Sequence, residues 1–146
     1  MSTMLWPYLP DTTEPAMRPY WEGLDRGVLV LPRCGSCVRF VWYPVHRCPD
    51  CLGELEWAEV SPDGSLFSFT VVQRAFADEW KDAVPLVICL VELSEAPGVR
   101  LVCRAVQGEP SVPDIGSPLR IEFERLGDGV VMPVVRLAGA ESPAAV

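Results

Sequence analysis

Residues 34–51 read CGSCVRFVWYPVHRCPDC and place four cysteines in the pattern C-x2-C-x10-C-x2-C. A C-x2-C spacing lets one tight turn present two thiolates, and two such turns can meet around a tetrahedral Zn²⁺ ion. Four thiolates close the coordination sphere, whereas catalytic zinc keeps an open position, so the pattern favours a structural ion. We therefore predict one structural zinc ion, bound by Cys34, Cys37, Cys48 and Cys51.

Two such turns joined by a ten-residue loop form a zinc ribbon, and two alternatives apply to the metal and its ligands. Iron is the first, because a four-cysteine site with a Cys-Pro-x-Cys turn also suits a rubredoxin-type centre, and ligand type does not separate the two metals. Such a centre would make the chain an electron carrier. His46 is an alternative ligand, which we interpret as a polar loop residue. We expect Gly35 and Gly53 to supply flexibility to the two turns, with Gly53 at positive φ.

The residues before the cysteines predict a helix followed by a short strand. Residues 12–15 (TTEP) look like a helix start, with a hydroxyl cap, an acid and a proline in the first turn. Apolar residues at three-to-four spacing then continue to Leu24, and Gly27 ends the helix. Pro19 fits the first half of this helix poorly. Residues 28–31 (VLVL) form the strand that leads into the cysteine segment.

After Cys51 the sequence predicts strands separated by turn residues, at 55–60, 65–73, 86–93, 99–106, 119–124 and 130–135. Five strands from residue 65 onward suit a small barrel, because closure removes exposed strand edges. We predict a mainly β fold in four parts. They are a helical segment at 1–30, a zinc ribbon at 31–54, a five-stranded barrel at 55–138 and a flexible tail at 139–146.

The charge is unevenly distributed. The net charge is −8, and the chain from Cys48 onward holds sixteen acidic against seven basic residues, which disfavours general nucleic-acid binding. Residues 26–47 instead contain four arginines and no acid. They either offset the thiolate charge or form an anion site, where guanidinium groups hold a phosphate and aromatic rings stack on a base. The candidate contacts, for the head of coenzyme A or for single-stranded nucleic acid, are Arg33, Arg39, Trp42 and Arg47.

We find no catalytic set in the sequence. The chain has one histidine, no nucleophile–base pair, no phosphate loop and no dinucleotide motif, so we predict that it is not an enzyme on its own. Cys89 and Cys103 are equidistant from the centre of a predicted hairpin loop and should face each other as buried thiols. We expect a cytoplasmic protein, without a signal peptide or an apolar run of the roughly 18 residues needed to cross a bilayer.

An ordered set of motifs from Tyr20 to Leu137 resembles one protein family, the zinc-ribbon OB-fold proteins that accompany thiolases and other acyl-CoA enzymes. Val38 departs from its pattern, because the family usually shows glycine after the second cysteine. The motifs are YWEGL at 20–24, LPRC at 31–34 with Cys37 and Pro44, CPDC at 48–51, GSLFSFTVV at 64–72 and IGSPL at 115–119.

This resemblance implies an N-terminal helix, a rubredoxin-like zinc ribbon and a C-terminal five-stranded OB-fold barrel. It also implies a non-catalytic accessory subunit of a hetero-oligomer in lipid metabolism. The partner would be a thiolase-like enzyme (a thiolase, an acyltransferase or a retro-aldolase, as in steroid side-chain degradation), and this chain would help to form its acyl-CoA path. The alternative function is single-stranded nucleic-acid binding. We expect the partner surface to contain Tyr20, Trp21, Phe40 and Tyr43, although Tyr20 and Trp21 could instead pack on the barrel.

Overall fold

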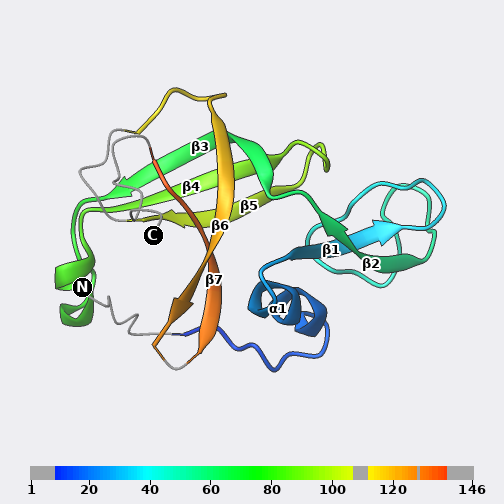
Figure 1. Ribbon diagram of the computed structural model, residues 1–146, viewed down its shortest axis with the longest axis horizontal. Helices are drawn as coiled ribbons and strands as arrows, with labels where there is room; N and C mark the ends of the chain where they lie inside the picture. The colour runs from blue at the N-terminus through cyan, green and yellow to red at the C-terminus, as the bar shows by residue number, and fades with distance from the viewer. Residues whose placement is uncertain (1–8, 107–111, 128, 138–146) are drawn as a thin grey trace, which may run out of the picture.

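The computed structural model describes residues 9–106, 112–127 and 129–137 (Figure 1). Strands dominate these residues, so the predicted mainly β fold is confirmed. No helix within the described ranges is long and apolar enough to cross a membrane. The elements in chain order are α1 (Arg18–Asp25), β1 (Leu29–Cys34), β2 (Leu55–Val60), β3 (Asp63–Val72), the 3-10 helix η1 (Asp78–Ala83), β4 (Leu86–Leu93), β5 (Arg100–Ala105), β6 (Pro118–Leu126) and β7 (Val130–Val135).

Five strands form the predicted closed barrel, in the order β3-β4-β5-β7-β6. The barrel closes because β6 pairs with β3 through residues 118–120. All of its pairings are antiparallel except that of β5 with β7. The long connection between β3 and β4 contains η1 and extends from one end of the barrel (Figure 1). This arrangement confirms the predicted OB-like barrel.

The β4–β5 hairpin places the two cysteines outside the metal pattern opposite each other. Cys89 is the register partner of Cys103. Both side chains are buried, and both thiols are free. Burial raises the pKa of Cys103 to about 12, with a smaller contribution from the neighbouring Cys89. The predicted pair of buried, facing thiols is therefore confirmed.

A separate two-stranded sheet carries the ribbon. β1 and β2 pair antiparallel, from Leu29 opposite Val60 to Cys34 opposite Leu55. The strand expected at 55–60 thus lies beside the ribbon, and Ser61 leads from it into the barrel. The domain boundaries drawn from the sequence stay a prediction.

The predicted helix start at residues 12–15 is wrong, because α1 begins at Arg18. Thr13 does not cap a helix: its N–H and its hydroxyl both donate to Asp11 Oδ1, at 2.8 and 2.6 Å. Pro19 occupies the first turn, where its missing N–H removes no helical hydrogen bond. A start at residue 12 would have put this proline deep in the helix, where it would clash with the preceding turn. The predicted end is confirmed, since Gly27 has φ 77°.

One hydrophobic core joins the helix, the base of the ribbon and the barrel. Its buried members include Tyr20 and Leu24 of α1 and Leu31 of β1, together with residues of every barrel strand. The helix packs closely on β1 at Gly23, where a Cβ atom would lie 2.7 Å from Val30 Cγ2. The helix therefore lies directly against the strand that leads to the cysteines.

Candidate metal centre

Two turns bring the four predicted ligands together at the end of the β1–β2 sheet. Cys34 ends β1 and Cys37 follows in the next turn, while Cys48 and Cys51 lie in a second turn before β2. The four Sγ atoms lie within 4.8 Å of one another. Cys34 Sγ is 3.4 Å from Cys51 Sγ, and Cys37 Sγ is 3.7 Å from Cys48 Sγ. Metal–sulfur bonds of about 2.3 Å imply tetrahedral edges of roughly 3.8 Å, so the sulfurs fit one four-coordinate ion.

Backbone donors favour the thiolate form of Cys34. The N–H groups of Ser36 and Cys37 both donate to its Sγ, at 3.4 Å each. These hydrogen bonds lower the pKa of Cys34 to about 6, and the bond from the Cys37 N–H has the largest effect. A thiolate is the form that binds metal. Cys34 and Cys48 are buried whereas Cys51 is exposed, so one side of the centre faces solvent.

The backbone of the two turns differs from the sequence expectation. Gly53 does not adopt positive φ; the residues that do are Val38, with φ 59°, and Leu52, with φ 62°. Each directly follows the second cysteine of its pair. Gly53 is required for space instead, because a Cβ atom there would lie 2.8 Å from Cys34 Sγ. The left-handed position at Val38 also explains why glycine would suit it.

The ribbon has little apolar core of its own. Its buried cluster consists of Cys34, Val41 and Cys48, with Cys37 and Leu55 packed against it. Two of these three buried side chains are predicted metal ligands. Such a segment depends on metal binding for its folding free energy, which is worth about 10–16 kcal/mol in zinc-finger peptides at neutral pH.

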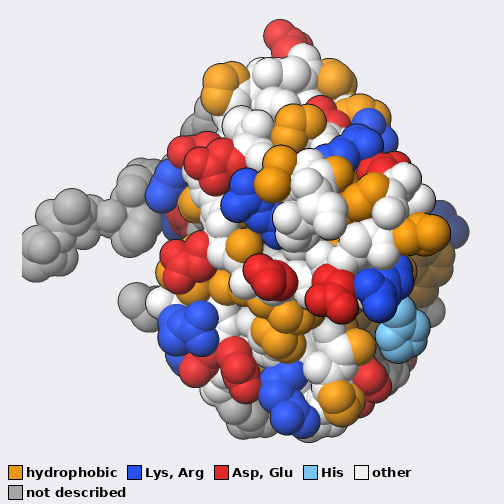
Figure 2. All heavy atoms as spheres, turned by 90° about the vertical axis from the view of Figure 1, so that its right-hand side faces the viewer, with side chains coloured by type: hydrophobic (Ala, Val, Ile, Leu, Met, Phe, Trp, Pro, Cys, Tyr) orange, Lys and Arg blue, Asp and Glu red, His pale blue; other side chains and the backbone are white. Residues whose placement is uncertain are grey.

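Two arginines of the ribbon, Arg39 and Arg47, are paired with acids that follow Cys48. Arg39 forms an ion pair with Asp50 at 2.7 Å and Arg47 one with Glu54 at 3.6 Å. Figure 2 shows acidic and basic side chains interspersed on this end of the molecule rather than a continuous basic patch. These pairs fit the charge-balance interpretation, because an incoming phosphate would have to compete with the carboxylates.

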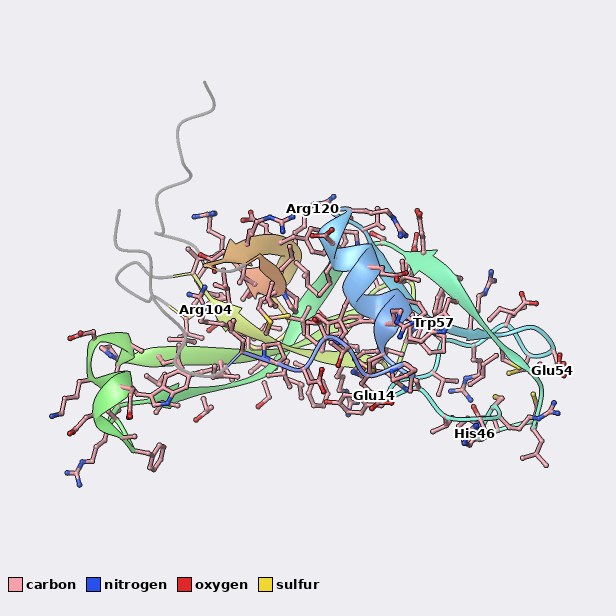
Figure 3. The ribbon with its side chains drawn as sticks, turned by 90° about the horizontal axis from the view of Figure 1, so that it is seen from below. Glu14, His46, Glu54, Trp57, Arg104 and Arg120 are labelled. Carbon is pink, nitrogen blue, oxygen red and sulfur yellow. The ribbon has the colours of Figure 1, made fainter. Side chains whose placement is uncertain are left out.

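The other predicted anion contacts lie apart from these pairs. The Arg33 guanidinium donates to the carbonyl oxygen of Val38 at 3.2 Å and lies 5.6 Å from the centre of the Phe40 ring. Trp42 is half-buried against the main core. His46 is exposed on the ribbon and is not a member of the metal cluster (Figure 3). Binding of coenzyme A or another anion by Arg33, Arg39, Trp42 and Arg47 stays a prediction.

Three of the predicted partner residues, Tyr20, Trp21 and Tyr43, belong to an aromatic cluster between α1 and the ribbon. The Tyr20 ring lies 5.1 Å from that of Trp21 and 4.9 Å from that of Trp42, which stacks on Tyr43 at 4.8 Å. Tyr20 is buried, while Trp21 and Phe40 are half-buried against the core. Tyr43 is 64% exposed. Contact of these residues with a partner stays a prediction, for which Tyr43 has the most free surface.

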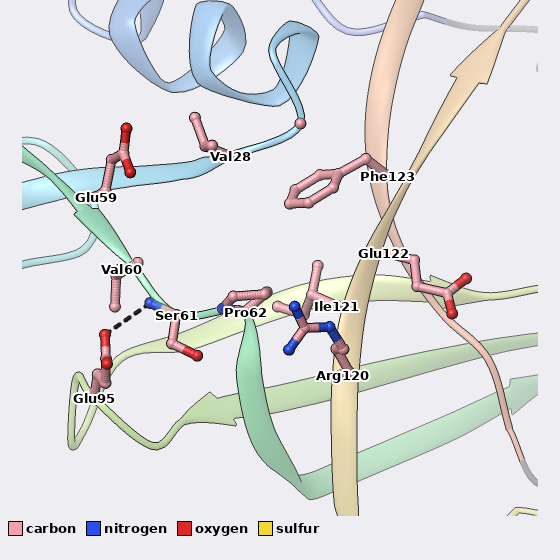
Figure 4. A pocket seen from close by; sticks show the side chains of 11 residues that line it. Val28, Glu59, Val60, Ser61, Pro62, Glu95, Arg120, Ile121, Glu122 and Phe123 are labelled. Carbon is pink, nitrogen blue, oxygen red and sulfur yellow. Dashed lines mark hydrogen bonds between the residues drawn. The ribbon is translucent and has the colours of Figure 1, made fainter.

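The structure also forms a groove of about 640 Å³ where helix, ribbon and barrel meet (Figure 4). In it, Glu95 accepts a hydrogen bond from the Ser61 N–H at 2.8 Å, and Arg120 pairs with Asp63 at 2.5 Å. The sequence held no signal for this groove, because its residues come from distant segments. It combines apolar side chains (Val28, Val60, Pro62, Ile121, Phe123) with charged ones (Glu59, Glu95, Arg120, Glu122).

Two family models match the chain. The rubredoxin-like zinc ribbon domain of ChsH2 matches residues 21–57, and the C-terminal OB-fold domain of ChsH2 matches residues 57–124. A DUF35 domain-containing scaffold protein of Methanothermobacter thermautotrophicus is 33% identical over 106 residues, which cover 68% of this chain and 74% of that protein. A probable enoyl-CoA hydratase alpha subunit of Thermomonospora curvata is 30% identical over 121 residues, or 82% of this chain. The chain spans only 36% of the length of that second relative.

Solved structures show the same likeness. A chain of the Ltp2-ChsH2(DUF35) aldolase matches with a TM-score of 0.75 and 26% identity, over 89% of this chain and 99% of that chain. A DUF35 protein of unknown function from Sulfolobus solfataricus matches with a TM-score of 0.58 at 20% identity, over 87% of this chain and 88% of that one, and shares the fold. This chain therefore belongs to the DUF35 family, with a ChsH2-type rubredoxin-like zinc ribbon ahead of an OB-fold domain.

Proposed function

We propose that this chain is a non-catalytic accessory subunit of an acyl-CoA-processing complex, in which it binds a thiolase-like enzyme. The observation that carries the proposal is the likeness to a chain of the Ltp2-ChsH2(DUF35) aldolase, which extends over 89% of this chain and 99% of that one. A match over the full length of that chain supports a similar role. The relative named as an enoyl-CoA hydratase alpha subunit supports an acyl-CoA substrate for the complex.

The metal in this proposal is a structural zinc ion. Four cysteine sulfurs close the coordination sphere, and the ribbon around them has few buried apolar residues. Cys34, Cys37, Cys48 and Cys51 would hold the ion and thereby the loop between them. Metal analysis by mass spectrometry tests this choice: one zinc per chain and a colourless protein are expected, whereas bound iron would refute it.

A role without catalysis is consistent with the surroundings of the ionisable groups. The only histidine of the chain, His46, lies exposed on the ribbon. The buried thiols Cys89 and Cys103 have raised pKa values because burial disfavours the thiolate, which makes them poor nucleophiles at neutral pH. Chemistry on the thioester would then be the task of the partner enzyme.

Co-expression with the thiolase-like enzymes of the same genome tests the proposal. We expect a stoichiometric complex on size-exclusion chromatography, and cleavage or transfer of an acyl-CoA thioester that is faster with this chain than without it. The chain alone should show no such activity. A chain that forms no complex with any of these enzymes, or that turns over acyl-CoA thioesters by itself, would refute the accessory role.

A further inference from the structure

The outer face of the β3–β4–β5 sheet exposes apolar side chains. Leu90, at the centre of β4, has Ser68 of β3 and Val102 of β5 as its register partners. Val102 is 58% exposed, and Phe67 of β3 is 40% exposed. Figure 1 shows the three strands side by side in one sheet. A hollow of about 190 Å³, here called the outer groove, lies on this face and is lined in part by Ser68, Ile88, Leu90 and Val102.

The sequence of β4 is unusual for a strand with one face in water. The strand reads LVICLVEL, with a single charged residue among eight. Its inward residues Cys89 and Val91 are fully buried in the barrel core. An antiparallel strand with one wet face normally alternates apolar and polar residues, whereas a near-continuous apolar run is typical of a strand covered on both faces. Apolar side chains that gather on a solvent-facing sheet surface favour an interaction with another molecule.

The charges on this face are already paired. Arg100 bonds to Glu92 at 3.3 Å, and its guanidinium lies 3.6 Å from the centre of the Phe67 ring. Arg104, which is buried, pairs with Glu124. The basic side chains described on these three strands are therefore offset by carboxylates and offer little to a polyphosphate backbone. This argues against single-stranded nucleic acid on the face where OB folds bind it.

The net charge also bears on the occupant. The chain carries −8, so two copies repel each other, and a large net charge favours the monomer. A face with apolar side chains and paired charges is complementary to an apolar, uncharged surface of another protein. We propose that the outer groove is the docking surface for the thiolase-like partner enzyme, with Val102 and Leu90 buried against an apolar patch of that enzyme. This inference rests on the proposed function and adds the surface that performs it.

One pair of matched substitutions tests this docking surface. Val102→Glu puts a charge into the outer groove, and Val45→Glu makes the same change at a 52% exposed valine on the ribbon. We expect Val102→Glu to weaken binding of the thiolase-like enzyme at least ~10-fold, as for a buried hot spot, and Val45→Glu to leave it unchanged. Circular dichroism and zinc content should equal those of the wild type. Val102→Ser replaces the first variant if that one does not fold.

The outcomes separate the two proposals. If the wild type binds no thiolase-like enzyme, the proposed function fails and this inference fails with it. If the wild type binds and Val102→Glu binds equally well, the proposed function stands and the outer groove is not the interface. Weakening by Val45→Glu alone would place the interface on the ribbon. If the wild type is a dimer and Val102→Glu dissociates it, the groove binds a second copy of this chain instead. If the wild type shifts a single-stranded oligonucleotide on a gel and Val102→Glu does not, the groove binds nucleic acid instead.

Discussion

Replacement of Gly53 by alanine tests the geometry of the metal centre. The added Cβ would lie 2.8 Å from Cys34 Sγ and 2.9 Å from Ser36 Oγ. The Ser36 hydroxyl can rotate away, but Cys34 Sγ cannot move without leaving its place in the coordination sphere. Gly53 does not adopt positive φ, so alanine adds no backbone strain and the cost comes from the overlap alone. Overpacking of this kind costs about 1–3 kcal/mol, which corresponds to metal binding about 5- to 150-fold weaker.

Competition with a chromogenic zinc chelator measures this loss. The matched control is Gly35→Ala in the first turn, where the nearest atom to an added Cβ would be the Glu54 carbonyl oxygen at 3.7 Å, an ordinary contact. We expect Gly35→Ala to hold zinc as the wild type does and Gly53→Ala to release it at lower chelator concentration. Equal zinc affinity in the two variants would show that Gly53 does not control the position of the Cys34 sulfur.

Three further predictions concern the ribbon and the barrel core. Val38→Gly should raise the melting temperature by about 2–4 °C, because a β-branched residue held at φ 59° destabilises the fold by roughly 1 kcal/mol or more. The control is Val45→Gly, which lies away from the positive-φ positions and should not raise the melting temperature. The free energy of unfolding should fall as the pH rises from about 9 towards 12. The Cys103 thiol has a pKa of about 12 in the folded chain and of 9.0 as a model thiol, so it loses its proton at lower pH in the unfolded chain, which is thereby stabilised. Urea titrations should show a shallower fall for Cys103→Ala, and an unchanged slope would contradict this origin. Acidification should release the metal, because protons compete for the four thiolates. Zinc that neither dissociates nor exchanges with a chelator as the pH is lowered from neutral to strongly acidic would contradict solvent access to the metal at the exposed Cys51.

Local patterns were enough to predict the metal centre and the barrel. The cysteine spacing specifies two turns, and few other arrangements of four close thiols are stable. Strand limits such as those of β4 and β7 follow from apolar runs bounded by turn residues, and the facing of Cys89 and Cys103 follows from counting outward from the hairpin loop. Each of these inferences depends on residues near one another in the chain.

The remaining features depend on contacts between distant segments. An amphipathic helix predicts that Tyr20 is on an apolar face, but not that this face meets Trp42 of the ribbon. The charge of residues 26–47 left open whether the arginines offset the thiolates or form an anion site. Asp50 and Glu54, just outside that window, pair with two of these arginines. The role of Gly53 was missed because a steric requirement set by Cys34, nineteen residues earlier, has no signature in the local sequence.

The metal ligands and the main core are linked through β1. Leu31 of this strand is fully buried in the main core, and Cys34, three residues on, supplies a ligand. The loop between the cysteine pairs carries Trp42, whose ring packs on Tyr20 of α1. Loss of the metal would free this loop and remove that contact, while the barrel would keep its own buried residues from β3 to β7. A metal ion bound by the four cysteines would thus act as a scaffold for the aromatic cluster rather than for the barrel. The outer groove on the far strands should remain formed when the ribbon is not.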